Sequence, residues 1–150
     1  MQDFRKLTVW RKAHHLTLEV YRVSICFPPE EKFALTSQLR RAAASIPTNI
    51  AEGCGRSRPN DKARFFDIAL GSASEVDYLL ILAHDLRYMS DDDFALLCPL
   101  TEKVKRMLAR LTAVVRRPVA DGFVGEEPEE FYERTEPNEN FEDAELITDN

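Results

Sequence analysis

The polar residues inside one otherwise apolar segment are the first candidates for chemistry in this chain. The nine residues from Ser45 onward read Ser-Ile-Pro-Thr-Asn-Ile-Ala-Glu-Gly, so Ser45, Asn49 and Glu52 are spaced i, i+4 and i+7. On a helix this spacing places all three on one face, which also approaches a neighbouring helix. A buried amide and a buried carboxylate need hydrogen-bonding partners. A second polar segment, with Ser72 and Glu75, is the candidate to supply them.

Two interpretations of this polar set are open. It could be a ligand or phosphate site in which Glu52 and Glu75 perform acid–base chemistry, provided that burial keeps one of them protonated. Alternatively, it is a structural network that sets helix register and the geometry of subunit packing. The sequence favours the structural interpretation and predicts no enzymatic activity, because no nucleophile, metal cluster or phosphate loop accompanies the carboxylates.

A proline lies within the same segment. Pro47 has no N–H to donate to the Ala43 carbonyl, a loss that costs about 3 kcal/mol in an unadapted helix interior. We therefore expect the helix to kink at Pro47 and the chain to turn at the glycines that follow.

The histidines and cysteines predict neither a metal site nor a cofactor. His14 and His15 are adjacent, so on a helix they point about 100° apart, and His84 has no second ligand at a helical spacing. We expect His14 to be a hydrogen-bonded core residue. The three cysteines form no metal-binding or disulfide pattern, and we expect all of them to be small buried hydrophobes: Cys26, Cys54 and Cys98.

Six cations within 25 positions form the second candidate site. They are Arg40, Arg41, Arg56, Arg58, Lys62 and Arg64. Arginine forks pair with phosphate oxygens, and displaced counterions add affinity, so the cluster predicts binding to nucleic-acid backbones. Phe65 and Phe66 are better explained as core residues, so we expect recognition of shape and charge rather than of stacked bases. The alternative is an ordinary solvated helix end.

Hydrophobic periodicity predicts four helices that must position these residues. We expect them at residues 6–26, 34–53, 61–88 and 91–116, with Ser90 as the N-cap of the last helix. The predicted connections are short, so successive helices are antiparallel neighbours. The sequence therefore predicts an all-α fold, an up-down-up-down antiparallel four-helix bundle.

Two of these helices carry more apolar surface than one bundle needs. In the first helix, one stripe consists of Leu7, Trp10, Leu18, Tyr21 and Ile25, and an opposite stripe consists of Val9, Ala13, Leu16, Val20, Val23 and Phe27. In the third helix, the two faces are Phe65, Ile68, Ala69, Val76, Leu79, Ala83 and Leu86, and Phe66, Leu70, Ala73, Leu80 and Ile81. The excess predicts a homo-oligomer that buries the second faces. The alternative is a monomer in which the first and third helices are simply the most buried ones.

Together with Trp10 upstream, the segments around Asn49 and Ser72 closely resemble the four-helix-bundle protein family of 23S rRNA intervening sequences, over roughly residues 4–115. This resemblance implies a ring of five bundles and no established enzymatic activity. More distantly, the sequence is similar to the accessory variability determinant of diversity-generating retroelements, a ring-forming bundle that binds nucleic acid.

The charge of the chain is divided between a basic body and an acidic tail. Residues 1–120 carry 19 Lys and Arg against 14 Asp and Glu, whereas residues 121–150 carry one Arg against 12 acids. The composition of residues 121–150 predicts a disordered tail, which either competes with nucleic acid for the basic cluster or only solubilises the protein. No segment reaches the roughly 20 apolar residues of a membrane span, and unpaired cysteines fit a cytoplasmic location.

From the sequence, we therefore expect a bundle at residues 1–120 that forms a cytoplasmic homo-oligomer, a pentamer by resemblance. We expect it to bind structured RNA or DNA or to scaffold a nucleoprotein complex. The alternative is a protein-protein interaction hub without a role in nucleic-acid binding.

Overall fold

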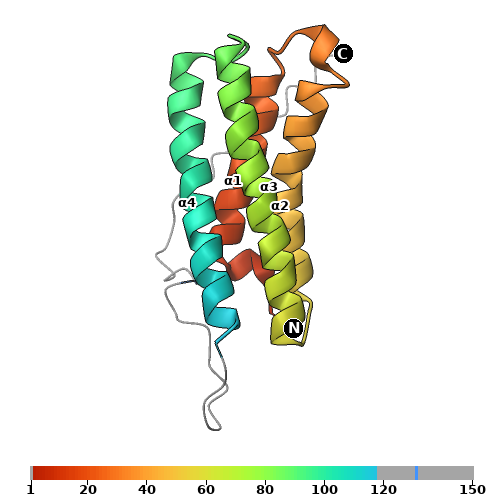
Figure 1. Ribbon diagram of the computed structural model, residues 1–150, viewed down its shortest axis with the longest axis vertical. Coiled ribbons are helices and arrows are strands. Elements are labelled where there is room, and N and C mark those ends of the chain that lie inside the picture. The colour runs from red at the N-terminus through yellow and green to blue at the C-terminus, as the bar shows by residue number, and fades with distance from the viewer. Residues whose placement is uncertain (1, 118–130, 132–150) are drawn as a thin grey trace, which may run out of the picture.

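Four α-helices dominate the part of the chain that the computed structural model describes, residues 2–117 and Phe131 (Figure 1). They are α1 (Thr8–Ser24), α2 (Leu35–Cys54), α3 (Pro59–Asp85) and α4 (Asp91–Val115), with short 3-10 helices η1 (Phe4–Lys6) and η2 (Pro29–Glu31). α1 and α3 each pack against both α2 and α4, so α1 and α3 occupy one diagonal of the bundle. This arrangement confirms the all-α, up-down-up-down fold, and the helix ends differ from the predicted ones by a few residues at most.

Local capping explains where α3 ends and α4 begins. The Ser90 hydroxyl accepts a hydrogen bond from the Asp93 N–H at 3.1 Å, as expected of an N-cap. α3 ends at Asp85, before the predicted Tyr88, because Arg87 adopts a left-handed conformation with φ of 61°. The Tyr88 N–H then donates to the Ala83 carbonyl at 2.9 Å. This is the hydrogen bond that closes a Schellman motif at the end of a helix.

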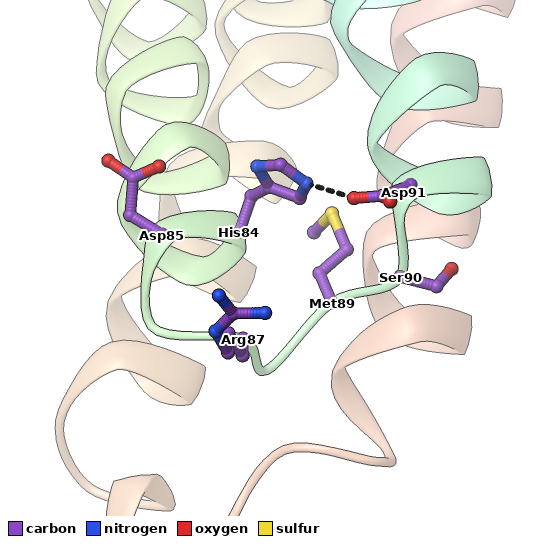
Figure 2. A pocket seen from close by; sticks show the side chains of 6 residues that line it. All are labelled: His84, Asp85, Arg87, Met89, Ser90 and Asp91. Carbon is purple, nitrogen blue, oxygen red and sulfur yellow. Dashed lines mark hydrogen bonds and ion pairs between the residues drawn. The ribbon is translucent and has the colours of Figure 1, made fainter.

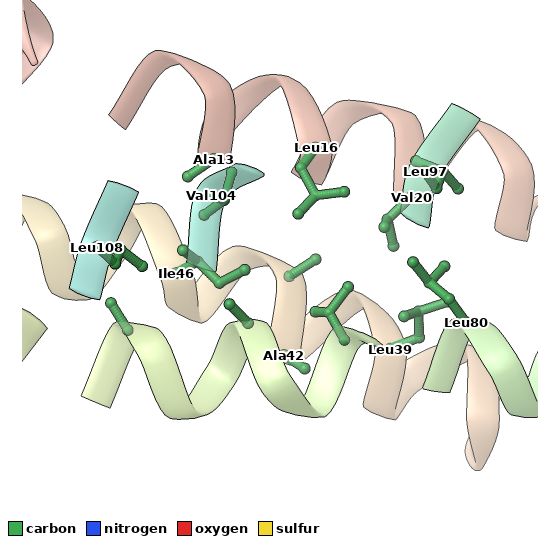
Figure 3. Packing of buried hydrophobic residues seen from close by; sticks show 14 of the residues in the cluster. Ala13, Leu16, Val20, Leu39, Ala42, Ile46, Leu80, Leu97, Val104 and Leu108 are labelled. Atoms are coloured by element: carbon green, nitrogen blue, oxygen red, sulfur yellow. The ribbon is translucent and has the colours of Figure 1, made fainter. Parts of the chain in front are cut away.

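The core lies between the four helices. Figure 3 shows side chains from all of them converging on the bundle axis, among them Leu16, Leu39, Leu80 and Leu108. The second predicted stripe of the first helix is confirmed as its core face, because its six members are all buried: Val9, Ala13, Leu16, Val20, Val23 and Phe27. Of the first stripe, Leu7 is buried, Trp10 is half-buried, and the others are exposed: Leu18, Tyr21 and Ile25.

The predicted division of α3 into two faces is wrong. Its buried residues come from both predicted faces and include Phe66, Ala69, Ala73, Val76, Leu79, Leu80 and Ala83. The exposed residues Ile68, Ile81 and Leu86 also come from both faces. The physical reason is that α3 packs against two neighbours, so its core face is one wide arc.

Pro47 lies within α2, which continues through it to Cys54. The Ala43 carbonyl that Pro47 leaves without a helical partner accepts a hydrogen bond of 3.0 Å from the Thr17 hydroxyl of α1. The same hydroxyl lies 2.9 Å from the Ala13 carbonyl within its own helix. One side chain of α1 therefore compensates for the bond that the proline removes from α2.

The acidic residues 121–150 lie outside the described residues, with one exception, so the predicted disorder of this segment is not addressed. The exception is Phe131, which is 4% exposed and belongs to the core cluster. Within residues 2–117, no helix combines the length and the apolar content that crossing a membrane requires.

Removing the Thr17 hydroxyl should destabilise the bundle. Thr17→Val keeps the shape of the side chain but leaves the buried Ala43 carbonyl unsatisfied, so we expect the free energy of unfolding to fall by about 1 to 3 kcal/mol. Thr48→Val is the matched control, because the exposed Thr48 hydroxyl donates to the Ala44 carbonyl at 2.7 Å on the outer side of the same helix. Urea unfolding that returned equal losses for the two variants would contradict this role of Thr17.

Candidate functional site

The predicted polar network is present in part, at the contact between α2 and α3. The hydroxyl oxygens of Ser45 and Ser72 lie 2.8 Å apart. The Asn49 side-chain amide donates to the Ser45 carbonyl at 2.8 Å and to the Ser45 hydroxyl at 3.0 Å. Ser45, Asn49 and Ser72, three of the five predicted residues, are thus joined by hydrogen bonds where α2 contacts α3, and all three are half-buried. This geometry is that of a structural link.

The two carboxylates of the predicted network do not join it. Glu52 and Glu75 are both exposed, so the expectation that they are buried is wrong. Glu52 forms an ion pair with Arg56, and Glu75 accepts a hydrogen bond of 3.1 Å from Gln38. Because Gln38 and Glu52 are 14 residues apart on α2, these contacts lie about 21 Å apart along the helix axis. An acid–base pair of Glu52 and Glu75 is therefore excluded in this fold.

Gly53 allows the end of α2 to approach α3 closely. A Cβ at this position would lie 2.8 Å from Phe66 Cε1 and 3.2 Å from the Lys62 carbonyl oxygen. The Phe66 ring, which is buried as expected from the sequence, thus fills the space against Gly53. A side chain at residue 53 would therefore require the Phe66 ring or the backbone at Lys62 to move.

The six predicted cations divide into two groups. Arg40 lies 14 residues before Cys54, the last residue of α2, which corresponds to about 21 Å along the helix, and Arg56 follows in the turn. Arg40 donates to the Ser24 hydroxyl at 2.7 Å, and its guanidinium lies 4.8 Å from the centre of the Tyr21 ring. Arg41 is exposed beside it. The remaining four cations lie at the α2–α3 turn and in the first turns of α3.

Cations from three distant parts of the sequence meet at that turn. The N-terminus, the α2–α3 turn and the last turn of α4 lie at the same end of the bundle (Figure 1). The Gln2 N–H donates to the Cys54 carbonyl, the Lys62 ammonium donates to Gln2, and Arg116 forms an ion pair with Asp67. We call this surface the basic end; its cations are Arg5, Lys6, Arg56, Arg58, Lys62, Arg64, Arg116 and Arg117. Sequence reasoning missed four of these eight, Arg5, Lys6, Arg116 and Arg117, because only the fold brings them to the turn.

The basic end carries eight cations and the four carboxylates Asp3, Glu52, Asp61 and Asp67. Among the described residues, Lys6, Arg58 and Arg64 have no ion-pair partner, and all three are exposed. The opposite end has the reverse balance. Residues 28–34 and 85–93 contain six carboxylates and two cations, Lys32 and Arg87. The bundle is therefore electrostatically polarised along its axis.

A groove of about 620 Å³ lies between α1 and α2. Its aromatic wall is formed by Phe4, Trp10 and His14, and α2 contributes Pro47 and Glu52, among others. The Trp10 and His14 rings stack with centroids 5.2 Å apart and planes 6° apart. His14 is exposed, so its predicted place in the core is wrong: it lies over Trp10 on the outer side of α1.

A second pocket of about 460 Å³ lies at the acidic end, where α3 turns into α4. Figure 2 shows His84 reaching across the turn toward Asp91, and the two side chains are 2.7 Å apart. The His84 ring also stacks on Phe94 with centroids 4.1 Å apart. Nearby, the Arg22 guanidinium donates to Asp93 at 2.9 Å and lowers the pKa of that carboxyl. These contacts tie α3 and α1 to the start of α4.

The described residues contain no cluster of three or more side chains that could hold a metal ion. The cysteines occupy three different environments. Cys54 is buried, Cys98 is half-buried with a thiol pKa raised by burial, and Cys26 is exposed, so the expected burial is wrong for Cys26.

The fold and these surfaces define an up-down-up-down helical-bundle protein with a basic end and an aromatic groove. A family model described as "23S rRNA-intervening sequence protein" matches residues 5–110, and the chain belongs to this family. The chain is also similar to a solved structure from Bacteroides thetaiotaomicron, a protein with unknown function from the S23 ribosomal protein family. The two share 21% identity over 73% of this chain and 100% of the other, with a TM-score of 0.65, which supports the fold. No curated protein matches the chain.

If Ser45, Asn49 and Ser72 form a structural link, loss of one hydroxyl should affect stability more than loss of a carboxylate nearby. We expect Ser72→Ala to lower the free energy of unfolding by about 1 kcal/mol, because the half-buried Ser45 hydroxyl loses its partner on α3. Glu52→Ala, on the exposed side, should change it by about 0.5 kcal/mol or less. Chemical denaturation that gave the reverse order would contradict the structural interpretation.

Proposed function

We propose that this family member is a non-enzymatic, homo-oligomeric cytosolic protein that binds structured nucleic acid or scaffolds a nucleoprotein complex. The single observation that carries the proposal is the convergence of eight cations from three parts of the sequence on the basic end. The sequence alone presents these cations as scattered residues, whereas the fold assembles them into one surface.

The chemistry of this surface suits a phosphate backbone. Seven of the eight cations are exposed, all except the half-buried Lys62. Three of the exposed cations, Lys6, Arg58 and Arg64, lack carboxylate partners among the described residues. Exposed guanidinium groups pair with phosphate oxygens, and the release of counterions from the nucleic acid adds affinity.

Self-association is supported by apolar side chains on the outer sides of α1 and α3. On α1, Leu18 is 50%, Tyr21 46% and Ile25 75% exposed. On α3, the exposed apolar residues are Ile68, Tyr78, Ile81 and Leu86. These faces lie on one diagonal, so copies could join α1 to α3 in a closed ring, and the resemblance to the family suggests five members. A ring would repeat the basic end and convert a modest surface into a multivalent one.

The exposed apolar faces also support the second candidate, a protein-protein interaction hub. In that case the same residues would contact a different protein, and the basic end would remain an ordinary solvated surface. Nucleic-acid binding by the purified protein separates the two candidates.

We expect the protein to be an oligomer in solution, with a mass above the 17.2 kDa of one chain. Leu18→Asp combined with Ile25→Asp should lower the mass measured by light scattering, because each substitution would bury a charge at the interface. Leu96→Asp is the control, since Leu96 is exposed to a similar extent on α4, outside the two proposed faces. A mass near that of one chain at micromolar concentration for the unmodified protein would contradict self-association.

For nucleic-acid binding, we expect a fluorescently labelled, fully paired RNA hairpin to bind with an affinity that falls as salt rises. Arg58→Ala combined with Arg64→Ala should weaken binding about tenfold at low salt and reduce the slope of log K against log salt by about 1 to 2. The control pair, Lys32→Ala and Lys103→Ala, removes the same charge elsewhere and should change the affinity by about threefold or less. Equal losses for the two pairs would contradict the proposed surface, and no binding by any of these proteins would favour the interaction hub.

A further inference from the structure

The groove between α1 and α2 lies beside the basic end. Phe4, at its edge, belongs to η1, and the guanidinium of the next residue, Arg5, lies 5.4 Å from the centre of the Phe4 ring. On the other side, Glu52 lines the groove and forms an ion pair with Arg56 of the basic end. A nucleic acid held by its phosphates at the basic end would therefore have the groove within reach of its bases.

The aromatic wall of the groove has the features of a stacking platform. Phe4 and Trp10 are in contact with centroids 4.9 Å apart, and His14 lies parallel to Trp10. Trp10 is half-buried and His14 is exposed, so the stack begins in the protein and ends at its surface. Planar aromatic groups of a ligand extend such stacks, and each stacked base strengthens binding to a protein by about fivefold to a hundredfold.

Polar groups of α2 border the apolar part of the groove. The carboxylate of Glu52 has acceptor capacity beyond its pair with Arg56, because two carboxylate oxygens offer about four lone-pair positions. Guanine presents two adjacent N–H donors, at N1 and N2, on its Watson–Crick edge, and this edge is accessible only when the base is unpaired. The groove thus combines a stacking wall with an acceptor suited to guanine.

From this juxtaposition we propose that the α1–α2 groove binds one unpaired nucleobase, preferably guanine, of a nucleic acid whose phosphates lie on the basic end. The inference rests on the proposed nucleic-acid binding and extends it, because it adds recognition of an unpaired base to recognition of charge. It differs from the expectation from sequence, which is recognition of shape and charge rather than of stacked bases. Phe4, Trp10 and His14 lie far from the predicted cations in the sequence, and only the fold places them beside the turn.

The test compares two RNA hairpins with the same guanine-free loop and the same number of phosphates, one with a fully paired stem and one with a single bulged guanine in the stem. Trp10 is the only tryptophan of the chain, so its emission reports directly on the groove. We expect the bulged hairpin to bind about tenfold more tightly than the paired one and to quench Trp10, which the paired hairpin does not. Replacing the bulged guanine by uracil should reduce this preference.

His14→Ala should reduce the preference for the bulged hairpin to about twofold while leaving the affinity for the paired hairpin unchanged. His15→Ala is the matched control, because His15 is also exposed but is not among the residues that line the groove, and it should retain the full preference. Both variants change exposed side chains, and unchanged thermal melting would show that they fold.

The outcomes that overturn the proposal are distinct. Equal binding of both hairpins without quenching of Trp10 would refute the base site and leave the proposed phosphate surface standing. Binding of neither hairpin would refute both proposals. A change of Trp10 emission on dilution without RNA, together with a lower oligomer mass for His14→Ala, would show that a second copy of the chain covers the groove instead.

Discussion

The rest of the structure depends on the short connections between antiparallel helices. Residues 55–58 join α2 to α3, and residues 86–90 join α3 to α4, so each helix must return along its predecessor. This constraint brings η1, the α2–α3 turn and the last turn of α4 to one end, and the start of α2 and the α3–α4 turn to the other. The charges of these segments then separate into a basic and an acidic end, although no long run of cations exists in the sequence.

Close helix packing accommodates the irregular residues that the sequence places in α2. The Thr17 hydroxyl satisfies the carbonyl freed by Pro47, and Gly53 leaves space for the Phe66 ring. Ser45 and Ser72 link α2 to α3 between these two points. The polar segment of residues 45–53 therefore serves mainly to stabilise the packing of α2 against α1 and α3. Its exposed members, Thr48 and Glu52, border the aromatic groove.

The sequence predicts what depends on local periodicity and capping. The four helices, the Ser90 cap and the core face of α1 follow from residues within a few turns of one another. The exposure of Glu52 could not be predicted, because spacing alone does not tell whether a shared face lies at the centre or at the edge of a helix contact. The partner of the Ala43 carbonyl, the exposed position of His14 and the complete basic end were also missed. Each of them depends on which helices become neighbours, and that information is absent from a single helical pattern.

The central claim is that cations from three separate segments form one nucleic-acid surface, and hydrogen–deuterium exchange with and without a paired RNA hairpin tests it most directly. Binding should slow amide exchange at residues 4–7, 55–64 and 113–117 together, because these segments meet at the basic end. Residues 28–34 and 86–93 at the acidic end should be unaffected, which provides an internal control. Protection confined to one of the three segments, or protection at the acidic end, would contradict the account.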